Sequence, residues 1–483
     1  MPAGLHIFDA FRENRIVLRH SPGLGKEHSL TQAEQLAAFV VRASYGDLSE
    51  DAGHYLKIRV LDGLGCALGA LKGKPIRLLK DQIEAFDGAR HCTLIGGGRA
   101  APDRAALFNT ALVRYLDFND SYLARGETCH PSDNIGSVLA ASEYAKQSGR
   151  TLLTSLAVAY QVQCRLSDVA PVRAKGFDHT TQGSYAVAAG VSKALDLDEV
   201  RTANAIAICG TAFNALRVTR TGALSNWKGL AYPNTAFSCT HGTFLAMQGI
   251  TGPLEVFEGN KGFMDAIAGE FKINWLEEGL ERVTLTILKR YNAEVHSQSV
   301  LEGILELKKE FALNGEEVAQ VDIEIFDVAY HIIGGGEEGD KTLVQTKEEA
   351  DHSLPYLVAV ALLDGQVMPE QYQPDRIESQ DVQSLLRRVI IKPSADYSRR
   401  FPDEMPCRIT LTLRDGRRVV REKRDYEGFR TRPMSWETAV EKFEKLVAPH
   451  TDRSLCQGII DAVSHLESIQ VSELTELLGK VRG

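Results

Sequence analysis

LKIRVLDGLGCALGAL, residues 56–71, is the stretch that decides the fold. Its apolar residues recur at helical spacing, which predicts a helix. The small residues Gly63, Gly65, Ala67 and Gly69 lower the intrinsic helix propensity, but they leave room for a neighbouring helix to approach closely. We expect such a helix deep inside a bundle, so the stretch predicts a mainly α protein.

Helix signals continue on both sides of this stretch, from Thr31 to about residue 282, and strand signals are nearly silent there. Thr31 and Glu34 fit a capping box, in which each side chain satisfies a free backbone donor at the start of a helix. Further apolar windows of helical period include RAALFNTALVRYL, LLTSLAVAYQVQCRL and TANAIAICGTAFNAL. We therefore expect a large helical domain over residues 1–284.

The pattern changes after residue 284. VDIEIFDV alternates at period 2, RRVIIKPS is a short β-branched run, and RITLTLRDGRRVVREKR predicts a hairpin around Asp415 and Gly416. Helical windows at 298–310 and 352–364 interleave with these strands, so we predict a smaller α/β (α+β) domain over residues 285–434. Amphipathic helices return over 435–483, and the residues alone leave open whether these close the small domain or rejoin the helical one.

The charge balance narrows the classes of partner. The 483 residues include 55 Lys+Arg and 64 Asp+Glu, for a formal net charge of −9, so the chain lacks an overall positive field that attracts nucleic acid or anionic lipid. No window offers about 18 uncharged apolar residues, and the N-terminus lacks the apolar region of a signal peptide. We expect a cytoplasmic protein with no nucleic-acid or membrane partner, which must capture any anionic ligand locally.

The eight cysteines are scattered singly, without a CxxC pair or a close Cys/His cluster of the kind that builds zinc or iron–sulfur sites. The glycine-rich segments GGGR (96–99) and HIIGGGEEGDK (331–341) fit neither GxGxxG nor GxxxxGK[ST], and the sequence has no HExxH or GxSxG. We therefore expect no metal and no cofactor.

The densest polar segment is YLDFNDSYLARGETCHPSDNIG, between two apolar helical windows. It carries Asp117, Asn119, Asp120, Ser121, His130, Ser132, Asp133 and Asn134. Helix capping explains two or three of these residues but not eight. Functional residues favour loops held by rigid elements, so a site and a plain capped loop are about equally favoured here.

A second polar segment, RVTRTGALSNWKGLAYPNTAFS, contains Arg217, Arg220 and Lys228. The two arginines need be no more than complements of a helix dipole. Lys228 stands in apolar surroundings, where a lysine can act as a base or hold a substrate carboxylate.

A third candidate region is split between KRYNAEVHSQSV and TKEEADHSLPYLVAVALLDG. Each part places a His/Ser pair before an apolar helical window, at His296 and His352, and His179 has a similar place. A lone histidine is more often structural, but the recurrence of the arrangement raises the odds of a site.

Five motifs, in this order, make the chain similar to the MmgE/PrpD family: YLDFND (115–120), HPSDN (130–134), SNWKGLAYPN (225–234), EVHSQ (294–298) and DHSLPYLVAVALLDG (351–365). They span most of the chain and leave out the leader before residue 30. The resemblance implies a large all-helical domain, an inserted lid near residues 285–434, a C-terminal return to the helical domain and a homodimer.

The resemblance also implies site residues and a reaction. The site residues are Asp117, Ser121, His130, His179, Lys228, His296 and Tyr356. HPSDN is typical of the family's 2-methylcitrate dehydratases, whereas members that decarboxylate cis-aconitate tend to resemble HPSG. This implies a metal-independent hydro-lyase of propionate breakdown. A cis-aconitate decarboxylase, a related tricarboxylate lyase or epimerase, and a non-catalytic helical binding protein are the alternatives.

The chemistry of such a dehydration assigns roles to the candidates. Removing a proton next to a carboxylate adds negative charge to a tricarboxylate substrate, so cations must stabilise it. We expect Arg217, Arg220 and Lys228 to hold carboxylates, and His130 to act as general acid–base. We expect Asp117 to orient His130 or a substrate hydroxyl, and Asp120 to help bind the substrate. Tyr356 or His296, on the lid, is expected to supply the second acid–base group.

Overall fold

The small-residue stretch forms most of helix α2 (Glu50–Gly69) in the computed structural model, which describes residues 29–86, 88–222 and 224–482. A Cβ atom added at Gly63 would lie 2.6 Å from Cδ1 of Ile135 in α5 (Ile135–Tyr144). One added at Gly65 would lie 3.1 Å from the Phe443 ring in α17 (Trp436–Val447). The expected close approach of neighbouring helices is therefore confirmed. The leader, residues 1–28, lies outside the described residues.

Helices dominate the chain up to Met247, as the sequence predicts. Besides α2 and α5, they are α1 (Gln32–Arg42), α3 (Lys74–Phe86), α4 (Pro102–Tyr115), α6 (Gly149–Val169), α7 (Thr180–Ala194), α8 (Glu199–Ala212) and α9 (Trp227–Met247). The capping box of α1 is confirmed, because Thr31 Oγ1 accepts from the Glu34 amide at 3.2 Å and the Glu34 carboxylate accepts from the Thr31 amide at 2.8 Å.

Two short hairpins interrupt these helices where the sequence gives almost no strand signal. They are β1 (Cys92–Thr93) with β2 (Arg99–Ala100), and β3 (Tyr122–Ala124) with β4 (Glu127–Cys129). Strands of two or three residues are too short to show a period-2 pattern, which explains why they were not predicted. The second hairpin lies inside the polar segment and shapes the loop that carries His130.

The α/β part contains a four-stranded sheet in the order β6-β5-β7-β8. The strands are β5 (Val318–Ile325), β6 (Val389–Pro393), β7 (Cys407–Leu413) and β8 (Arg418–Lys423). β6 runs parallel to β5, whereas β7 is antiparallel to both β5 and β8. The predicted β7–β8 hairpin is confirmed, and Gly416 in its turn has a φ of 89°, a conformation that favours glycine.

The helices of this part are α10 (Gln298–Glu310), α11 (Asp327–Ile333), α12 (Lys347–Ala350), α13 (Leu354–Asp364), α14 (Pro374–Ile377), α15 (Gln380–Leu386) and α16 (Ala395–Arg400). Of these, α10, α11 and α13 contact the strands of the sheet. α10 lies against β7, where alternate residues from Cys407 to Leu413 are buried. A Cβ atom at Gly303 would lie 2.6 Å from Cδ1 of Ile409, so glycine again permits the contact. The fold is therefore mainly α with a smaller α/β part, as predicted.

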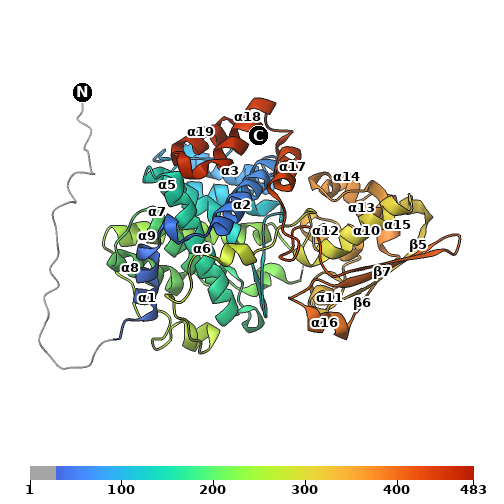
Figure 1. Ribbon diagram of the computed structural model, residues 1–483, viewed down its shortest axis with the longest axis horizontal. Coiled ribbons are helices and arrows are strands. Elements are labelled where there is room, and N and C mark those ends of the chain that lie inside the picture. Colours follow the sequence, from blue (N-terminus) through green and yellow to red (C-terminus); the bar gives the residue numbers. More distant parts are fainter. Residues whose placement is uncertain (1–28, 87, 223, 483) are drawn as a thin grey trace, which may run out of the picture. The chain divides into compact units, whose positions relative to one another are not determined.

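The C-terminal helices return to the first part of the chain, where they contact α2 and α5 (Figure 1). After α17 come α18 (Arg453–Ser464) and α19 (Val471–Lys480). One hydrophobic core draws its residues from 33–288 and 434–481, and a second draws them from 287–429. The chain thus leaves the first core, builds the second and returns to the first.

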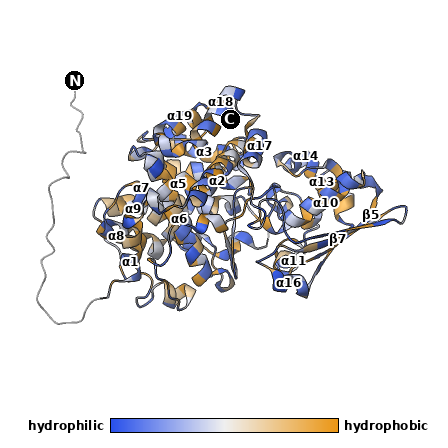
Figure 2. Ribbon diagram, viewed as in Figure 1, coloured by the Kyte–Doolittle hydropathy of each residue, from blue (hydrophilic) through white to orange (hydrophobic). Residues whose placement is uncertain are grey.

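Hydropathy follows this packing. The buried faces of α5 and α9 combine apolar side chains with small polar ones such as Ser142 and Thr240, and hydrophobic residues gather where these helices lie (Figure 2). Among the described residues, no helix combines the length and the apolar composition that crossing a bilayer requires.

Candidate active site

Asp117 stands just past the C-terminal end of α4, in a strained backbone conformation. Its φ is 54°, which is in the left-handed region, and its amide donates to the Arg114 carbonyl at 3.0 Å. This turn directs the carboxylate back onto the Arg114 guanidinium, with Nη1 2.6 Å from Oδ1. A non-glycine residue held in this region costs on the order of 1–3 kcal/mol, and such strain is concentrated at functional sites.

Two lysines from distant segments also meet Asp117. Lys289 Nζ is 2.7 Å from Asp117 Oδ1, and Lys228 Nζ, on the first turn of α9, is 3.4 Å from Oδ2. All three side chains are at most 5% exposed. Burial by itself raises the pKa of Asp117, but the neighbouring cations outweigh it and hold that pKa well below its ordinary value.

Asp351, at the end of α12, forms a second anionic centre beside the first. Its Oδ1 lies 2.8 Å from Lys228 Nζ and 2.6 Å from His352 Nδ1, and its Oδ2 lies 2.6 Å from Lys347 Nζ. Burial raises the pKa of Asp351, yet the Lys228 and Lys347 ammonium groups lower it further than burial raises it. Lys228 therefore links a carboxylate of the helical part to one of the α/β part.

The charges of this cluster do not balance. Its cations are Arg114, Lys228, Lys289 and Lys347, whereas its buried carboxylates are Asp117 and Asp351. A cavity of about 10 Å³ lies among these groups, and Glu348 at its edge accepts from Asn226 at 3.0 Å. Asp133 Oδ2 also lies 3.7 Å from Arg114 Nε, but burial raises the pKa of Asp133 to about 7. Asp117, Asp351 and Glu348 then oppose four cations, which leaves a small positive excess that suits an anionic ligand.

His130 lies in the loop after β4, where a polar network fixes its ring. Its Nδ1 is 2.7 Å from the Asp120 carbonyl and 3.1 Å from the Ser121 hydroxyl. A carbonyl only accepts, so Nδ1 carries the proton and Nε2 has the free lone pair. Burial lowers the pKa of His130 well below its ordinary value, and the Arg114 and Lys289 cations lower it further. His130 is therefore neutral, with a proton-accepting Nε2.

Asp120 anchors this loop. Its carboxylate accepts from the Ser132 amide at 3.0 Å, from the Ser132 hydroxyl at 2.7 Å and from the Tyr160 hydroxyl at 2.7 Å. The carboxylate oxygens are thus committed inside the fold, which differs from the expectation that Asp120 helps to bind substrate. The groups at His130 Nδ1 come from Asp120 and Ser121, whereas Asp117 pairs with cations. That Asp117 orients a substrate hydroxyl, the other role expected for it, stays a prediction.

His179 lies next to His130, with ring centroids 5.4 Å apart and edge to face. Its Nδ1 is 3.2 Å from Asp178 Oδ1, and its buried Nε2 has no hydrogen-bond partner among the described residues. Burial lowers the pKa of His179 to about 3, with Arg220 adding to the effect against the opposing charge of Asp178. Two neutral imidazoles therefore stand side by side.

The structure separates the three cations that were expected to share the substrate. Lys228 joins the cluster, but Arg220 Nε binds the Asp178 carboxylate at 2.7 Å and Arg217 Nη2 binds Glu338 at 3.1 Å. Both arginines are thus already paired with acids. Arg217 and Arg220 are the first and last residues of one short 3₁₀ turn, η5 (Arg217–Arg220), and they bind different acids.

The expected contributions from the α/β part also lie elsewhere. The Tyr356 hydroxyl donates to the Gln371 carbonyl inside the second core. His296 Nδ1 is 2.7 Å from Glu294 Oε1, and its ring packs against Phe326 and Phe401 at centroid distances of 5.6 Å. Catalytic roles for Tyr356 and His296 therefore stay predictions. The group that α12 and α13 bring to Lys228 is His352.

Several residues of the cluster were not selected from the sequence. Arg114 precedes Asp117 by three residues at a helix end, and Lys347 precedes Asp351 by four, spacings that bring side chains together on helices. Lys289 sits in the apolar run TILK just before the EVHSQ motif. A search for lysines that stand in apolar surroundings, close in the sequence to a motif with an acidic residue, would have selected Lys289.

One combination of side chains in the cluster has the composition of a metal site. Asp117, Asp351 and His352 offer ligand atoms that all lie within 4.8 Å of one another. Lys228 Nζ contacts all three groups, however, and a divalent ion there would also meet Arg114, Lys289 and Lys347. The arrangement is therefore better matched to holding an anion against fixed cations.

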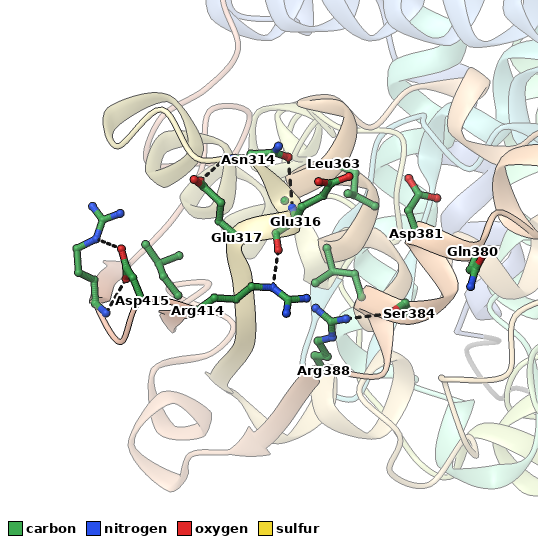
Figure 3. Close-up of a pocket in the computed structure, with 14 residues that line it drawn as sticks. Asn314, Glu316, Glu317, Leu363, Gln380, Asp381, Ser384, Arg388, Arg414 and Asp415 are labelled. Atoms are coloured by element: carbon green, nitrogen blue, oxygen red, sulfur yellow. Dashed lines mark hydrogen bonds and ion pairs between the residues drawn. The ribbon is translucent and has the colours of Figure 1, made fainter.

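A larger cavity, of about 830 Å³, lies in the α/β part and away from this cluster (Figure 3). It is lined in part by Arg388, Arg414 and Arg417. Arg388 Nη2 donates to the Ser384 hydroxyl at 2.9 Å, and Arg417 Nε pairs with Asp415 at 2.7 Å. Because Glu316, Glu317, Asp381 and Asp415 also line it, the cavity has no excess positive charge. This cavity is therefore less suited to an anionic ligand than the cluster around Lys228, although its volume is larger.

Comparison with family models gives two matches that together cover most of the chain. The MmgE/PrpD N-terminal domain matches residues 34–276, and the MmgE/PrpD C-terminal domain matches residues 291–468. The first match contains Asp117, His130 and Lys228, and the second contains Asp351 and His352.

Curated relatives match nearly end to end. The chain is 25% identical to the mouse (Mus musculus) cis-aconitate decarboxylase, with 92% of this chain and 93% of the relative covered. It is 27% identical to an alkylcitrate dehydratase of a fungal species, with 87% and 88% covered. It is 25% identical to the 2-methylcitrate dehydratase of Salmonella typhimurium, with 88% and 92% covered.

Proposed function

Because the chain belongs to the MmgE/PrpD family, we propose that it dehydrates 2-methylcitrate to 2-methyl-cis-aconitate. The relatives named above are two dehydratases and a decarboxylase, so the chain is an enzyme of the lyase class. The HPSDN motif favours dehydration. The proposal includes a place in propionate breakdown, a homodimer and a reaction that needs no metal or cofactor.

The observation that carries the proposal is the excess of buried cations close to a neutral histidine. Removing a proton from carbon next to a carboxylate creates negative charge that spreads onto the carboxylate oxygens. Arg114, Lys228 and Lys289 are fixed in a dry site, where charge stabilisation is strong. Arg114 and Lys289 lower the pKa of His130, which supports a base and cations that act on one substrate.

The reaction then divides between base, cations and acid. His130 Nε2 accepts the proton from carbon, the electron pair of the C–H bond forms the double bond, and the hydroxyl leaves as water after receiving one proton. Arg114 and Lys289 hold the substrate carboxylates throughout. His179, edge-on to His130, keeps the side of the base dry and contributes no charge.

Substrate binding requires the cluster to open. The cavity of about 10 Å³ has room for about one water molecule, and a tricarboxylate is several times larger. Lys347 and Glu348 on α12 form one wall and Lys228 and Gly229 on α9 form another. The proposal therefore includes a separation of α12 from the start of α9, with the substrate carboxylates replacing Asp351 or Asp117 as partners of the lysines.

Decarboxylation of cis-aconitate is the second candidate, and the mouse relative favours it. That reaction must deliver a proton to carbon after CO₂ leaves, so its key residue must hold a proton at the start. The free lone pair on His130 Nε2 favours a residue that takes a proton, which is why dehydration is the first choice.

Purified protein incubated with 2-methylcitrate, citrate and cis-aconitate tests both candidates. Absorbance of the conjugated acid reports dehydration, and released CO₂ reports decarboxylation. We expect absorbance to rise with 2-methylcitrate, without CO₂, and to rise equally after exhaustive chelation. His130→Asn should lower kcat by about 10²–10⁴-fold.

The matched control is His241→Gln, which changes an exposed histidine on α9 and should keep full activity. Release of CO₂ from cis-aconitate without dehydration of 2-methylcitrate would replace the first candidate by the second. If none of the three acids is consumed, the proposed function is wrong.

A further inference from the structure

His352 stands at the junction of α12 and α13, and the steps above do not use it. Its Nδ1 is 2.6 Å from Asp351 Oδ1 and 2.9 Å from Lys228 Nζ. Lys228 Nζ is itself 2.8 Å from Asp351 Oδ1. The ammonium, the imidazole and the carboxylate therefore form a closed triangle of three atoms at hydrogen-bond distance.

This triangle determines where the protons are. A carboxylate oxygen and an unprotonated Nδ1 are both acceptors, and two acceptors 2.6 Å apart without a proton between them repel strongly. Nδ1 of His352 therefore carries a proton and donates it to Asp351, as does Lys228. The third contact, between Lys228 Nζ and Nδ1, joins two nitrogens that both hold protons at rest.

The other ring nitrogen follows from this assignment. With the proton on Nδ1, the neutral imidazole has its lone pair on Nε2. Asp117 Oδ2 lies 3.9 Å from Nε2 of His352, which is too far for a hydrogen bond. The His352 side chain is 13% exposed, whereas those of Lys228 and Asp351 are 4% and 0% exposed. His352 is thus the member of the triangle that water can reach.

We propose that His352 is a proton-relay residue that recharges Lys228, the acid that protonates the departing hydroxyl. Lys228 gives one proton to the hydroxyl, which leaves as water, and becomes a neutral amine. His352 takes a proton from solvent on Nε2 and passes its Nδ1 proton across the 2.9 Å contact to the amine. To reset, the ring takes a second proton from solvent on Nδ1, beside Asp351, and loses its Nε2 proton to solvent, so each turnover draws one net proton from solvent.

The relay balances with the step assigned to His130. The proton from carbon ends on His130 and is lost to solvent, the proton of the water formed comes from Lys228, and His352 replaces it from solvent. Asp351 positions both nitrogens and, held by Lys347 at 2.6 Å, stays ionised throughout. The inference rests on the proposed dehydration for its chemistry but not for its proton assignment.

Deuterium exchange separates the relay from the base. In D₂O, His352→Gln should still exchange the substrate C–H proton, because His130 is intact, while kcat for elimination falls by about 10²-fold with little change in KM. His130→Asn should lose exchange and elimination together. His241→Gln should match the unaltered protein. Full kcat in His352→Gln, or equal loss of exchange and elimination, would overturn the relay.

A second measurement is independent of turnover, so it separates failure of the relay from failure of the proposed function. Protein labelled with ¹⁵N-histidine, compared with His352→Gln, identifies the resonances of His352. We expect a protonated Nδ1 and an unprotonated Nε2. A protonated Nε2 with a bare Nδ1 would overturn the relay even if the dehydratase assay succeeds. If no tricarboxylate is consumed but the expected protonation is found, the substrate was misassigned and the proton assignment stands.

Discussion

Two buried lysines, Lys442 and Lys228, show how a structural cation differs from a functional one. Lys442 on α17 meets Asp62 on α2 at 2.6 Å, and it donates to the Phe118 and Lys289 carbonyls at 2.8 and 2.9 Å. Two of its N–H groups are therefore directed at fixed carbonyls, and the ion pair with Asp62 adds a third fixed partner. Its ammonium also lies 3.6 Å from the centre of the Phe118 ring.

Lys228 has no such complement of fixed acceptors. Its closest partners are one carboxylate and a histidine nitrogen that already holds a proton, Asp117 lies farther away at 3.4 Å, and the small cavity is next to it. The lesson is that burial alone does not separate the two lysines, since both are about equally buried. Counting where each N–H goes does separate them.

The largest effect should come from breaking the structural pair. Lys442→Met leaves the Asp62 carboxylate buried without its cation, so the free energy of unfolding should fall by about 3–5 kcal/mol. Urea unfolding followed by circular dichroism measures the change.

The double variant Asp62→Asn, Lys442→Met is the matched control. It removes both charges and should recover much of the lost stability, because a buried pair of charges can be replaced at little net cost. If the single variant loses under about 1 kcal/mol, Lys442 is not the structural clamp described above.

Lys228→Met should affect catalysis more than stability. Asp351 keeps Lys347 and Asp117 keeps Arg114 and Lys289, so no carboxylate loses its last cation. Removing one charge-stabilising donor should lower kcat by about 10²–10³-fold. Steady-state kinetics with 2-methylcitrate, beside urea unfolding, measures both quantities.

The contrast between the two variants is the test. Stability loss in Lys228→Met should be clearly smaller than in Lys442→Met at the same pH. Equal losses of stability, with activity retained by the folded fraction, would mean that Lys228 is also structural.

The same distinction explains how far the sequence could lead. The glycines of α2 predict close helix packing, and the alternation of apolar and polar residues in β5 and the Asp415–Gly416 turn predict strands. These signals are local in the sequence, which is why they could be used. Asp62 lies in that same stretch of α2, yet its partner Lys442 is far along the chain, and no local pattern connects them.

In the candidate site, too, local signals can be read from the sequence and long-range pairings cannot. The polar density around Asp117 and His130 was visible in the sequence, and so was the apolar setting of Lys228. The pairing of Arg217 with Glu338 and of Arg220 with Asp178 depends on chain segments that only the fold brings together. The contact of His352 with Lys228 is likewise made only by the fold, and the sequence pattern selected Tyr356, four residues later, instead.

The smallest effect is a pH dependence that belongs to the site and comes from His179. Its pKa is about 3 in the folded protein, because of burial, and about 6.5 when unfolded, so folding favours the neutral ring. This contribution to stability is fully present above pH 6.5 and is lost as the pH falls toward 3. At pH 5 the loss amounts to about 2 kcal/mol relative to pH 7.

His179→Gln should therefore show a shallower fall in the free energy of unfolding between pH 7 and pH 5 than the unaltered protein. Asp133 acts in the opposite direction, since burial raises its pKa to about 7 and its contribution is lost as the pH rises from about 3.8. Both proteins contain Asp133, so the difference between their slopes isolates His179. The exposed His241→Gln should leave the slope unchanged. Parallel slopes in the His179→Gln and unaltered proteins would mean that His179 is charged in the fold, and the neutral pair of His179 with His130 would then have to be abandoned.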